Sequence, residues 1–301
     1  MAPVQPGDGP IGLVGVGIMG SGIARRLIEH GYAVVAFDKS DDAMSRARQM
    51  GCATAATPAE VASRARVVLI SLPKPEHVVD VVRGGDDNLL AGAQEGAVII
   101  DVSTVNPATS RGNAEAAAEK GVGYLDCPIL GRPAAAGHWT LPSGGEAEHL
   151  ALVTPVLETF ANRIVHVGPS GQGNMLKLLN NLMFGAINAI TCEVFALGER
   201  LGMDSQFMFD TIVDSGAGTV SNLFRDIGPK IAGRDFSANF SIDNMAKDVG
   251  LGIAMAAEVG MTLEVSESGQ RANRKAQETG LGSEDTSAVV KVFEQRGSAM
   301  A

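Results

Sequence analysis

The chain has 301 residues, of which 45% are hydrophobic and 19% charged, so it is long enough for about two domains and too poor in charge for a disordered chain. Its 24 basic and 34 acidic residues leave a net charge of −10, which argues against nucleic acid and anionic membranes as partners. The three cysteines form no CxxC pair, and the first ten residues carry no targeting pattern, so we expect a cytoplasmic protein without disulfides.

The first half of the chain alternates short β-branched runs with amphipathic segments. This alternation predicts parallel βαβ units. Six strands are expected, at residues 11–15, 33–37, 67–71, 97–102, 122–125 and 164–167.

After residue 168 the pattern is helical throughout. The predicted helices cover residues 173–200, 204–214, 221–232, 241–259, 263–279 and 285–295. In the first of them apolar residues recur every three or four positions, but the apolar run 182–197 is interrupted by Asn188 and Glu193, which favours a buried helix over a membrane span. One small domain covers such a helix poorly, so we expect a homodimer or homotetramer.

Gly15, Gly17 and Gly20 form a GxGxxG motif between the first predicted strand and the next helix. In this context the glycines allow a tight turn, a close approach to a pyrophosphate and close packing of helix on strand. Asp38 follows the second strand, where a carboxylate binds a ribose and repels a 2′-phosphate, although Lys39 beside it weakens that preference. We expect NAD as the cofactor, with NADP as the alternative.

These signals together predict an α/β fold in two parts. Residues 1–169 form a Rossmann-type, doubly wound parallel sheet that binds a dinucleotide. Residues 170–301 form an all-α domain that begins with a long interdomain helix and serves substrate binding and oligomerisation. Residues 71–73 and 101–104 follow strands at the edge where open α/β sheets bind ligands, so they line the nicotinamide end of the cleft or are ordinary turns.

Lys177 and Asn181 lie four residues apart near the start of the long helix, and therefore on one face. Leucines flank Lys177, and desolvation lowers the pKa of a lysine from about 10.4 toward the range useful to a general acid or base. Asn181 would then orient a substrate hydroxyl. These residues alone leave a second interpretation open, in which the amine extends to solvent and the asparagine satisfies buried backbone.

Four segments together resemble the β-hydroxyacid dehydrogenases, a family that includes 3-hydroxyisobutyrate dehydrogenase and tartronate semialdehyde reductase. They are residues 15–20, Asp126-Cys127-Pro128 with the loop after it, residues 171–181, and Lys247-Asp248. The resemblance spans nearly the whole chain. It implies hydride transfer between NAD(P) and the hydroxyl-bearing carbon of a small 3-hydroxy acid, or reduction of the matching semialdehyde.

The same resemblance implies roles for single residues. Lys177 is expected to give or take the proton, and Asn181 to orient the substrate. With the loop residues already described, the expected cofactor contacts are Gly15, Gly17, Ile18, Met19, Gly20, Asp38, Leu72, Pro73, Thr104 and Lys247.

The loop after the Asp-x-Pro motif departs from the family pattern. Where Ser-Gly-Gly is usual, this chain has Leu130, Gly131 and Arg132, and we take these as substrate-binding residues together with Asn181. Leu130 cannot replace the hydrogen bond of a serine hydroxyl. Arg132 either compensates, by binding a carboxylate or sulfonate with two parallel bonds, or is a solvated loop residue. Trp139 replaces a smaller residue and is expected to reshape the pocket wall.

Two alternative functions stay open, the first of them because of this altered loop. One is an NADP-dependent reductase of an imine or unusual aldehyde, and the other is a non-catalytic dinucleotide-binding interaction protein, against which the intact Lys177 and Asn181 count. Decarboxylation of a phosphosugar acid is not expected. Asn180 stands where 6-phosphogluconate dehydrogenases carry a histidine, and the chain is too short for their C-terminal domain. The five histidines show no ligand spacing, so we expect no metal.

Overall fold

The computed structural model describes residues 2–215 and 221–295. The chain divides into two compact units, residues 1–177, called the sheet unit here, and residues 178–301, called the helical unit. Each is described by itself. The domain boundary predicted at residue 169 stays a prediction. The division into compact units falls after residue 177, so the first turns of the following helix count with the sheet unit.

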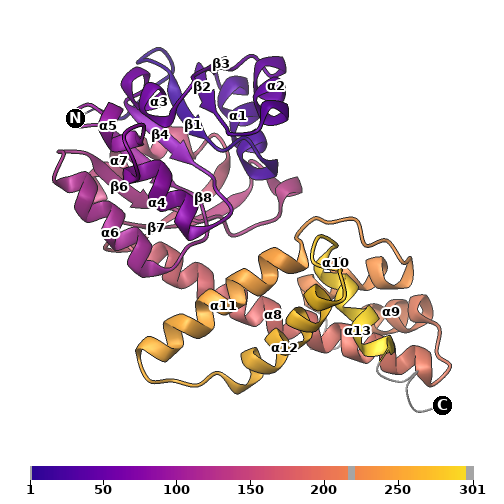
Figure 1. Ribbon diagram of the computed structural model, residues 1–301. Coiled ribbons are helices and arrows are strands. Elements are labelled where there is room, and N and C mark those ends of the chain that lie inside the picture. Colours follow the sequence, from indigo (N-terminus) through magenta and orange to yellow (C-terminus); the bar gives the residue numbers. More distant parts are fainter. Residues whose placement is uncertain (1, 216–220, 296–301) are drawn as a thin grey trace. The chain divides into compact units, whose positions relative to one another are not determined.

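The sheet unit is built on an eight-stranded sheet with the order β3-β2-β1-β4-β5-β6-β7-β8 (Figure 1). Every neighbouring pair is parallel except β6 and β7. The first six strands have the order that places a ligand crevice between β1 and β4, which confirms the predicted doubly wound fold. The strands are β1 (Ile11–Val14), β2 (Val34–Phe37), β3 (Ala53–Thr54), β4 (Val67–Ile70), β5 (Val98–Asp101), β6 (Gly123–Asp126), β7 (Trp139–Gly144) and β8 (Ala161–Gly168).

Helices cover both faces of this sheet because alternate residues of the strands point to opposite sides. Leu13 of β1 joins a core cluster with α1 and α7, whereas Val14 joins a second cluster with α3 and α4. Leu27 of α1 is fully buried, so truncation to alanine costs about 2–5 kcal/mol of stability. The helices are α1 (Ile18–Glu29), α2 (Asp41–Gln49), α3 (Pro58–Arg64), α4 (Pro75–Arg83), α5 (Leu89–Gly92), α6 (Pro107–Ala118) and α7 (Ala147–Leu157), with a 3-10 turn η1 (Pro133–Ala135).

Two strands were not predicted from the sequence. β3 has only two residues, too few for a periodic pattern. β7 contains Pro142 and ends at Gly144, and a proline lacks the N–H that a ladder requires, so its sequence does not look like a strand. β7 nonetheless pairs with β8 along its whole length, with register shifts at both ends.

The described part of the helical unit contains helices and no strand, which confirms the all-α prediction. Phenylalanine rings mark its core: Phe209 and Phe224 are stacked with ring centroids 5.6 Å apart, and Phe195 and Phe224 are tilted with centroids 5.9 Å apart. The helices are α8 (Gln172–Arg200), which begins in the sheet unit, α9 (Ser205–Asp214), α10 (Asn222–Ala232), α11 (Ile242–Glu258), α12 (Glu264–Glu278), the 3-10 turn η2 (Thr286–Val289) and α13 (Val290–Gln295).

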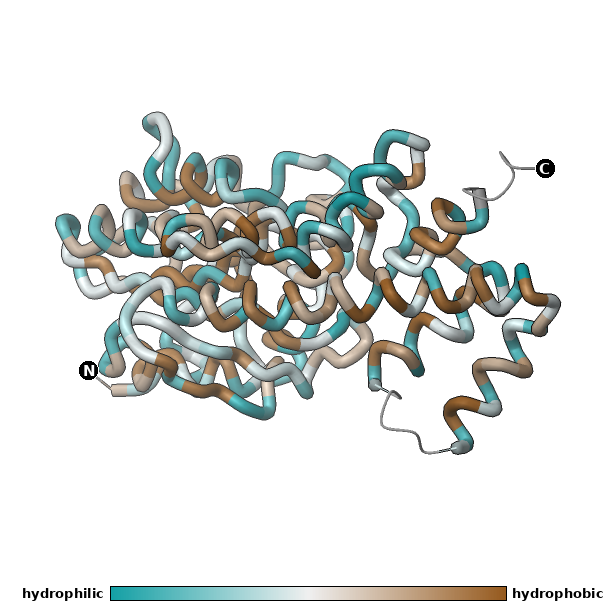
Figure 2. The backbone as a smooth tube through the Cα atoms, turned by 90° about the horizontal axis from the view of Figure 1, so that it is seen from below, coloured by the Kyte–Doolittle hydropathy of each residue, from teal (hydrophilic) through white to brown (hydrophobic). Residues whose placement is uncertain are grey.

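Helix α8 buries one face and exposes another apolar one. Asn188 and Phe195 are buried, whereas Met183 is 60% and Ile190 53% exposed. Apolar residues, brown in Figure 2, recur along this helix. By length and composition alone, α8 is the helix of the described residues that could cross a membrane. The expectation of a buried helix therefore holds for one face only. We call the exposed residues Leu179, Met183, Ile187, Ile190, Val194 and Leu197 the α8 stripe.

Candidate active site

The glycine-rich loop joins β1 to α1 in a conformation that only glycines permit. Gly15 has φ +94°, and a Cβ there would lie 2.2 Å from the backbone oxygen of Ser71. A Cβ on Gly20 would lie 2.0 Å from the backbone oxygen of Gly15. Gly17, in contrast, has open space around it and begins α1 without a side-chain cap. The first N–H groups of this helix are thus available to an anion such as a pyrophosphate.

Asp38 lies beside this loop, as the sequence predicts. Its Oδ2 accepts a hydrogen bond from the N–H of Val16 at 2.7 Å, and its Oδ1 accepts one from the N–H of Ser40 at 2.9 Å. A half-buried carboxylate at the end of β2 can still accept from ribose hydroxyls and repels an added phosphate. At the start of α1, Ile18 is 70% exposed and Met19 packs partly against the core.

The loops after β4 and β5 are joined to each other and to the glycine loop. The N–H of Leu72 donates to Ser103 Oγ at 2.9 Å, and the Leu72 side chain lies 3.1 Å from where a Cβ of Gly15 would be. Pro73 is exposed and Thr104, next to Ser103, is half-buried. The structure therefore brings Leu72 to the glycine loop and places Thr104 in the adjoining loop.

Asp101, at the end of β5, is fully buried beneath these loops. Burial raises the pKa of this carboxyl to about 6, although hydrogen bonds to Ser103 lower it. Its Oδ1 accepts from the N–H of Ser103 at 2.8 Å, and Tyr124 donates its hydroxyl to Oδ2 at 2.8 Å. Asp101 thus fixes the loop that carries Ser103 and Thr104.

Lys177 lies on the second turn of α8, and its amine contacts the loop after the Asp-x-Pro motif. We call this loop, residues 129–132, the substrate loop. Nζ donates to the backbone oxygen of Ile129 at 2.7 Å, in a half-buried setting. Ile129 directly precedes Leu130. The amine is therefore held against the protein rather than extended into bulk water, which disfavours the solvated interpretation.

The substrate loop is held in place by Trp139 and Thr140 of β7. Leu130 exchanges backbone hydrogen bonds of 2.9 and 3.1 Å with Thr140. Trp139 Nε1 donates to the backbone oxygen of Arg132 at 2.8 Å, and a Cβ on Gly131 would lie 2.4 Å from the indole, so this position requires glycine. Trp139 is 1% exposed and packs against Phe160. The expectation that Trp139 forms a pocket wall is wrong, because the ring belongs to the core under the loop.

In the helical unit, a buried carboxylate joins Asn181 to Lys247. Asn181 Nδ2 donates to Asp248 Oδ2 at 2.5 Å, and Lys247 Nζ lies 2.8 Å from Asp248 Oδ1. Asn180 Nδ2 donates to Asn181 Oδ1 at 3.0 Å. Asp248 is 2% exposed and was not predicted as a site residue. The sequence contains no local signal for it beyond its place next to Lys247.

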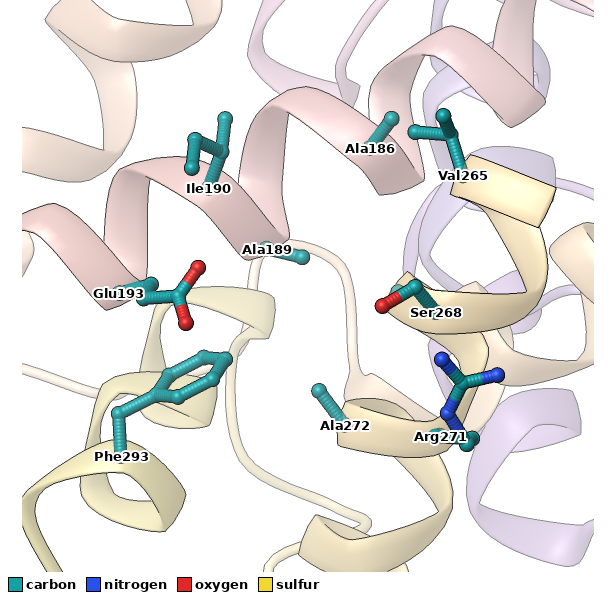
Figure 3. A pocket seen from close by; sticks show the side chains of 10 residues that line it. Ala186, Ala189, Ile190, Glu193, Val265, Ser268, Arg271, Ala272 and Phe293 are labelled. Atoms are coloured by element: carbon teal, nitrogen blue, oxygen red, sulfur yellow. The ribbon is translucent and has the colours of Figure 1, made fainter.

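The helical unit also holds a pocket of about 280 Å³ between α8 and α12 (Figure 3). Glu193 and Phe293 lie at one side, and Ser268 and Arg271 project from α12 on the other. None of the predicted catalytic or cofactor residues lines it. Among the described residues, no group of three or more His, Cys, Asp or Glu side chains could hold a metal ion.

Comparison with known proteins places these features in context. Residues 10–168 match the family described as the NAD binding domain of 6-phosphogluconate dehydrogenase, and residues 171–293 match that described as NAD-binding of NADP-dependent 3-hydroxyisobutyrate dehydrogenase. The chain is 31% identical to 2-(hydroxymethyl)glutarate dehydrogenase of Eubacterium barkeri, over 95% of each chain. It is 34% identical to 3-hydroxyisobutyrate dehydrogenase of Pseudomonas aeruginosa, over 83% of this chain and 86% of that one.

A solved structure is similar over the same extent. The 3-hydroxyisobutyrate dehydrogenase of Mycobacterium tuberculosis, in a structure with L-serine, superposes with a TM-score of 0.84 at 30% identity. The superposition covers 95% of this chain and 99% of that chain. Both the sheet unit and the helical unit therefore have counterparts in these proteins.

Proposed function

Because the chain belongs to the β-hydroxyacid dehydrogenase family, we propose that it transfers a hydride between a nicotinamide cofactor and the hydroxyl-bearing carbon of a small 3-hydroxy acid, in either direction. One observation carries the proposal: the Lys177 amine is held 2.7 Å from the backbone of the loop that resembles the substrate loop of the family. A proton donor and a substrate-binding segment thus lie together in the sheet unit.

The residues present fit a dinucleotide. The uncapped start of α1 would hold the pyrophosphate, Asp38 the ribose, and Leu72, Pro73 and Thr104 the nicotinamide end. When bound, the cofactor supplies or accepts the hydride. The carboxylate of Asp38 supports NAD over NADP, and a ratio of kcat/KM values for the two cofactors tests this preference.

Lys177 performs the proton transfer in this proposal. In oxidation its neutral amine takes the hydroxyl proton of the substrate, and in reduction its ammonium form protonates the developing alkoxide. The oxygen of Ile129 accepts one N–H and so fixes the direction of the amine. Asn181 follows one turn later on the same face of α8, and Asp248 holds its amide so that it can orient the substrate hydroxyl.

A nicotinamide absorbance assay with Lys177→Ala tests the mechanism. The panel comprises 3-hydroxyisobutyrate, L-serine, 2-(hydroxymethyl)glutarate, short hydroxysulfonates and semialdehydes. We expect kcat to fall by about 10² to 10⁴ while the Kd for NADH is unchanged. Lys120→Ala, an exposed lysine of the same unit, is the matched control. Normal turnover by Lys177→Ala would remove this residue from the mechanism.

We further propose that Arg132 binds the acidic group of the substrate, in place of the serine that the loop lacks. Arg132 is half-buried, and its backbone oxygen accepts a hydrogen bond from Trp139 Nε1, so the loop that carries the guanidinium is already in place when a carboxylate or sulfonate binds. Arg132→Ala should raise KM for anionic substrates and leave KM for an uncharged hydroxy amide unchanged. Equal KM changes for both substrates would reject this role.

The α8 stripe supports a homo-oligomer in which a second copy of this chain covers it. Its residues recur at three- and four-residue steps, which is the spacing of helices that pack on each other, and their exposure is unusual for a finished surface. Ile190 also lines the pocket beside α12, so the stripe reaches the edge of a pocket that carries the polar side chains Glu193, Ser268 and Arg271.

Light scattering after size exclusion tests this assembly. Met183→Glu with Ile190→Glu should give monomers, whereas Ala254→Glu, an exposed position on α11, should not. Monomeric wild-type protein that floats with liposomes would show instead that a membrane covers the stripe.

A further inference from the structure

We infer that Asp126 is a positioning residue: its carboxylate reaches from the end of β6 to the first turn of α8 and thereby sets where the Lys177 amine lies. The inference rests on the proposed function of Lys177. It concerns a residue to which the proposed mechanism assigns no step.

Asp126 caps α8 from a distant part of the chain. Its Oδ1 accepts from the N–H of Gly171 at 2.7 Å, and its Oδ2 accepts from the N–H of Asn174 at 2.8 Å. The residues so joined lie 45 and 48 positions apart. The N–H groups at the start of a helix lack partners within the helix, so one side chain from the sheet satisfies two donors there. Both oxygens must be acceptors for this arrangement.

The carboxylate has almost no room to move. Asp126 is fully buried, and a Cβ on Gly144 would lie 2.5 Å from its Oδ1. A Cβ on Gly173 would lie 2.3 Å from its backbone oxygen. Backbone of β7 and of α8 therefore closes on Asp126 from two sides, which turns the cap into a rigid connection.

Asn174 provides a second attachment for the same turn. Its Oδ1 accepts from the N–H of Val105 at 3.0 Å, and its Nδ2 donates to Ser110 Oγ at 3.2 Å. The turn that Asp126 caps is therefore also tied to the loop after β5 and to α6. This turn is a fixed part of the sheet unit.

The position of Lys177 follows from these contacts. Lys177 is three residues after Asn174, and its Nζ donates to the backbone of Ile129, three residues after Asp126. One short segment, residues 126–129, thus holds the helix start at one end and the amine at the other. A shift of the capped turn would move Nζ relative to Leu130 and Arg132, and a misplacement of about 1 Å can cost about 10²-fold in rate.

Asp126→Asn is the sharpest perturbation because it conserves shape. The amide keeps one acceptor but sets an NH₂ group against a backbone N–H that needs an acceptor. We expect kcat to fall about 10- to 100-fold, with the Kd for NADH unchanged because the glycine loop is untouched. Thr57→Ala removes the side-chain cap of α3, which accepts from Glu60 N–H, and controls for the loss of any cap. It should leave kcat unchanged.

A double-mutant cycle separates positioning from mere stability. With the most active substrate of the panel, Asp126→Asn should cost nothing further in a Lys177→Ala background, because the lost rate acts through that amine. Full additive loss, or wild-type kcat in Asp126→Asn alone, would overturn the inference and leave the proposed function intact. Normal turnover by Lys177→Ala alone would instead contradict the proposed function.

A second variant serves if Asp126→Asn does not fold. Asp126→Ser supplies one shorter acceptor and should lose less kcat than removal of both acceptors in Asp126→Ala. Hydrogen exchange of residues 169–180 should be faster in both variants than in the wild type. Unchanged exchange together with unchanged kcat would contradict a positioning role.

Discussion

The fully buried carboxyl of Asp101 makes the pH dependence of stability an incisive test of the sheet unit. The perturbation is Asp101→Asn combined with a change of pH. Burial raises the pKa of Asp101 from 3.8 to about 6 in the folded state, so the folded protein binds a proton more tightly than the unfolded chain does between these values. The free energy of unfolding therefore falls as the pH rises through this window.

The magnitude follows from the same two values. The interval from 3.8 to about 6 corresponds to about 3 kcal/mol, at 1.36 kcal/mol per pKa unit. The cost is absent below the unfolded pKa and complete above the folded one. Asp101→Asn cannot ionise, so its stability relative to the wild type should improve by about 2.5 kcal/mol between pH 4, where the unfolded carboxyl is already partly ionised, and pH 7.5. If the variant loses the hydrogen bond from Tyr124, its stability falls by the same amount at both pH values, so the change between them is unaffected.

Urea unfolding of both proteins at several pH values measures this difference. Trp139, the one tryptophan of the sequence, is buried in the sheet unit and reports on it by fluorescence. Asp235→Asn provides a contrast by circular dichroism, because hydrogen bonds to Ser237 lower the pKa of that exposed carboxyl and its stabilising contribution is lost as the pH falls. A constant difference between Asp101→Asn and wild type, or one that shrinks with rising pH, would refute the reasoning.

Three further predictions concern other parts of the molecule. Gly20→Ala sets a Cβ 2.0 Å from a backbone oxygen, so the Kd for NADH should rise by about 10-fold or more, and an unchanged Kd in a fluorescence titration would contradict the role of the loop. Asp248→Asn removes the carboxylate charge that lies 2.8 Å from Lys247 Nζ, and because this lysine side chain is 23% exposed the helical unit should lose about 1–3 kcal/mol, measured by chemical unfolding; a loss below about 0.5 kcal/mol would show the pair to be unimportant. Burial raises the pKa of the Cys127 and Cys192 thiols, so neither should react with Ellman's reagent at pH 8 until the protein is unfolded, and rapid reaction of the native protein would contradict the packing.

Much of the fold was predictable because its signals are local. The βαβ alternation and all strands except β3 and β7 follow from β-branched runs and their spacing, and the helices after residue 168 follow from apolar periodicity. β7 was not predicted because Pro142 is atypical of a strand interior. It forms a strand through its pairing with β8, which is a tertiary contact. Trp139 was misplaced because a side chain of that size suits a pocket wall or a core equally well, and the sequence carries no information about which side of β7 is buried.

The candidate site likewise has residues that local sequence signals predict and residues that only tertiary contacts reveal. Spacing alone determined the glycine loop with Asp38, and the four-residue step from Lys177 to Asn181, because steric limits and helix geometry act between near neighbours. Only the tertiary structure decided that Asp126 caps α8 and that Asp248 holds Asn181, across 45 and 67 positions of the chain. No periodicity reports such contacts, since they depend on which strand end and which helix face the packed core brings together.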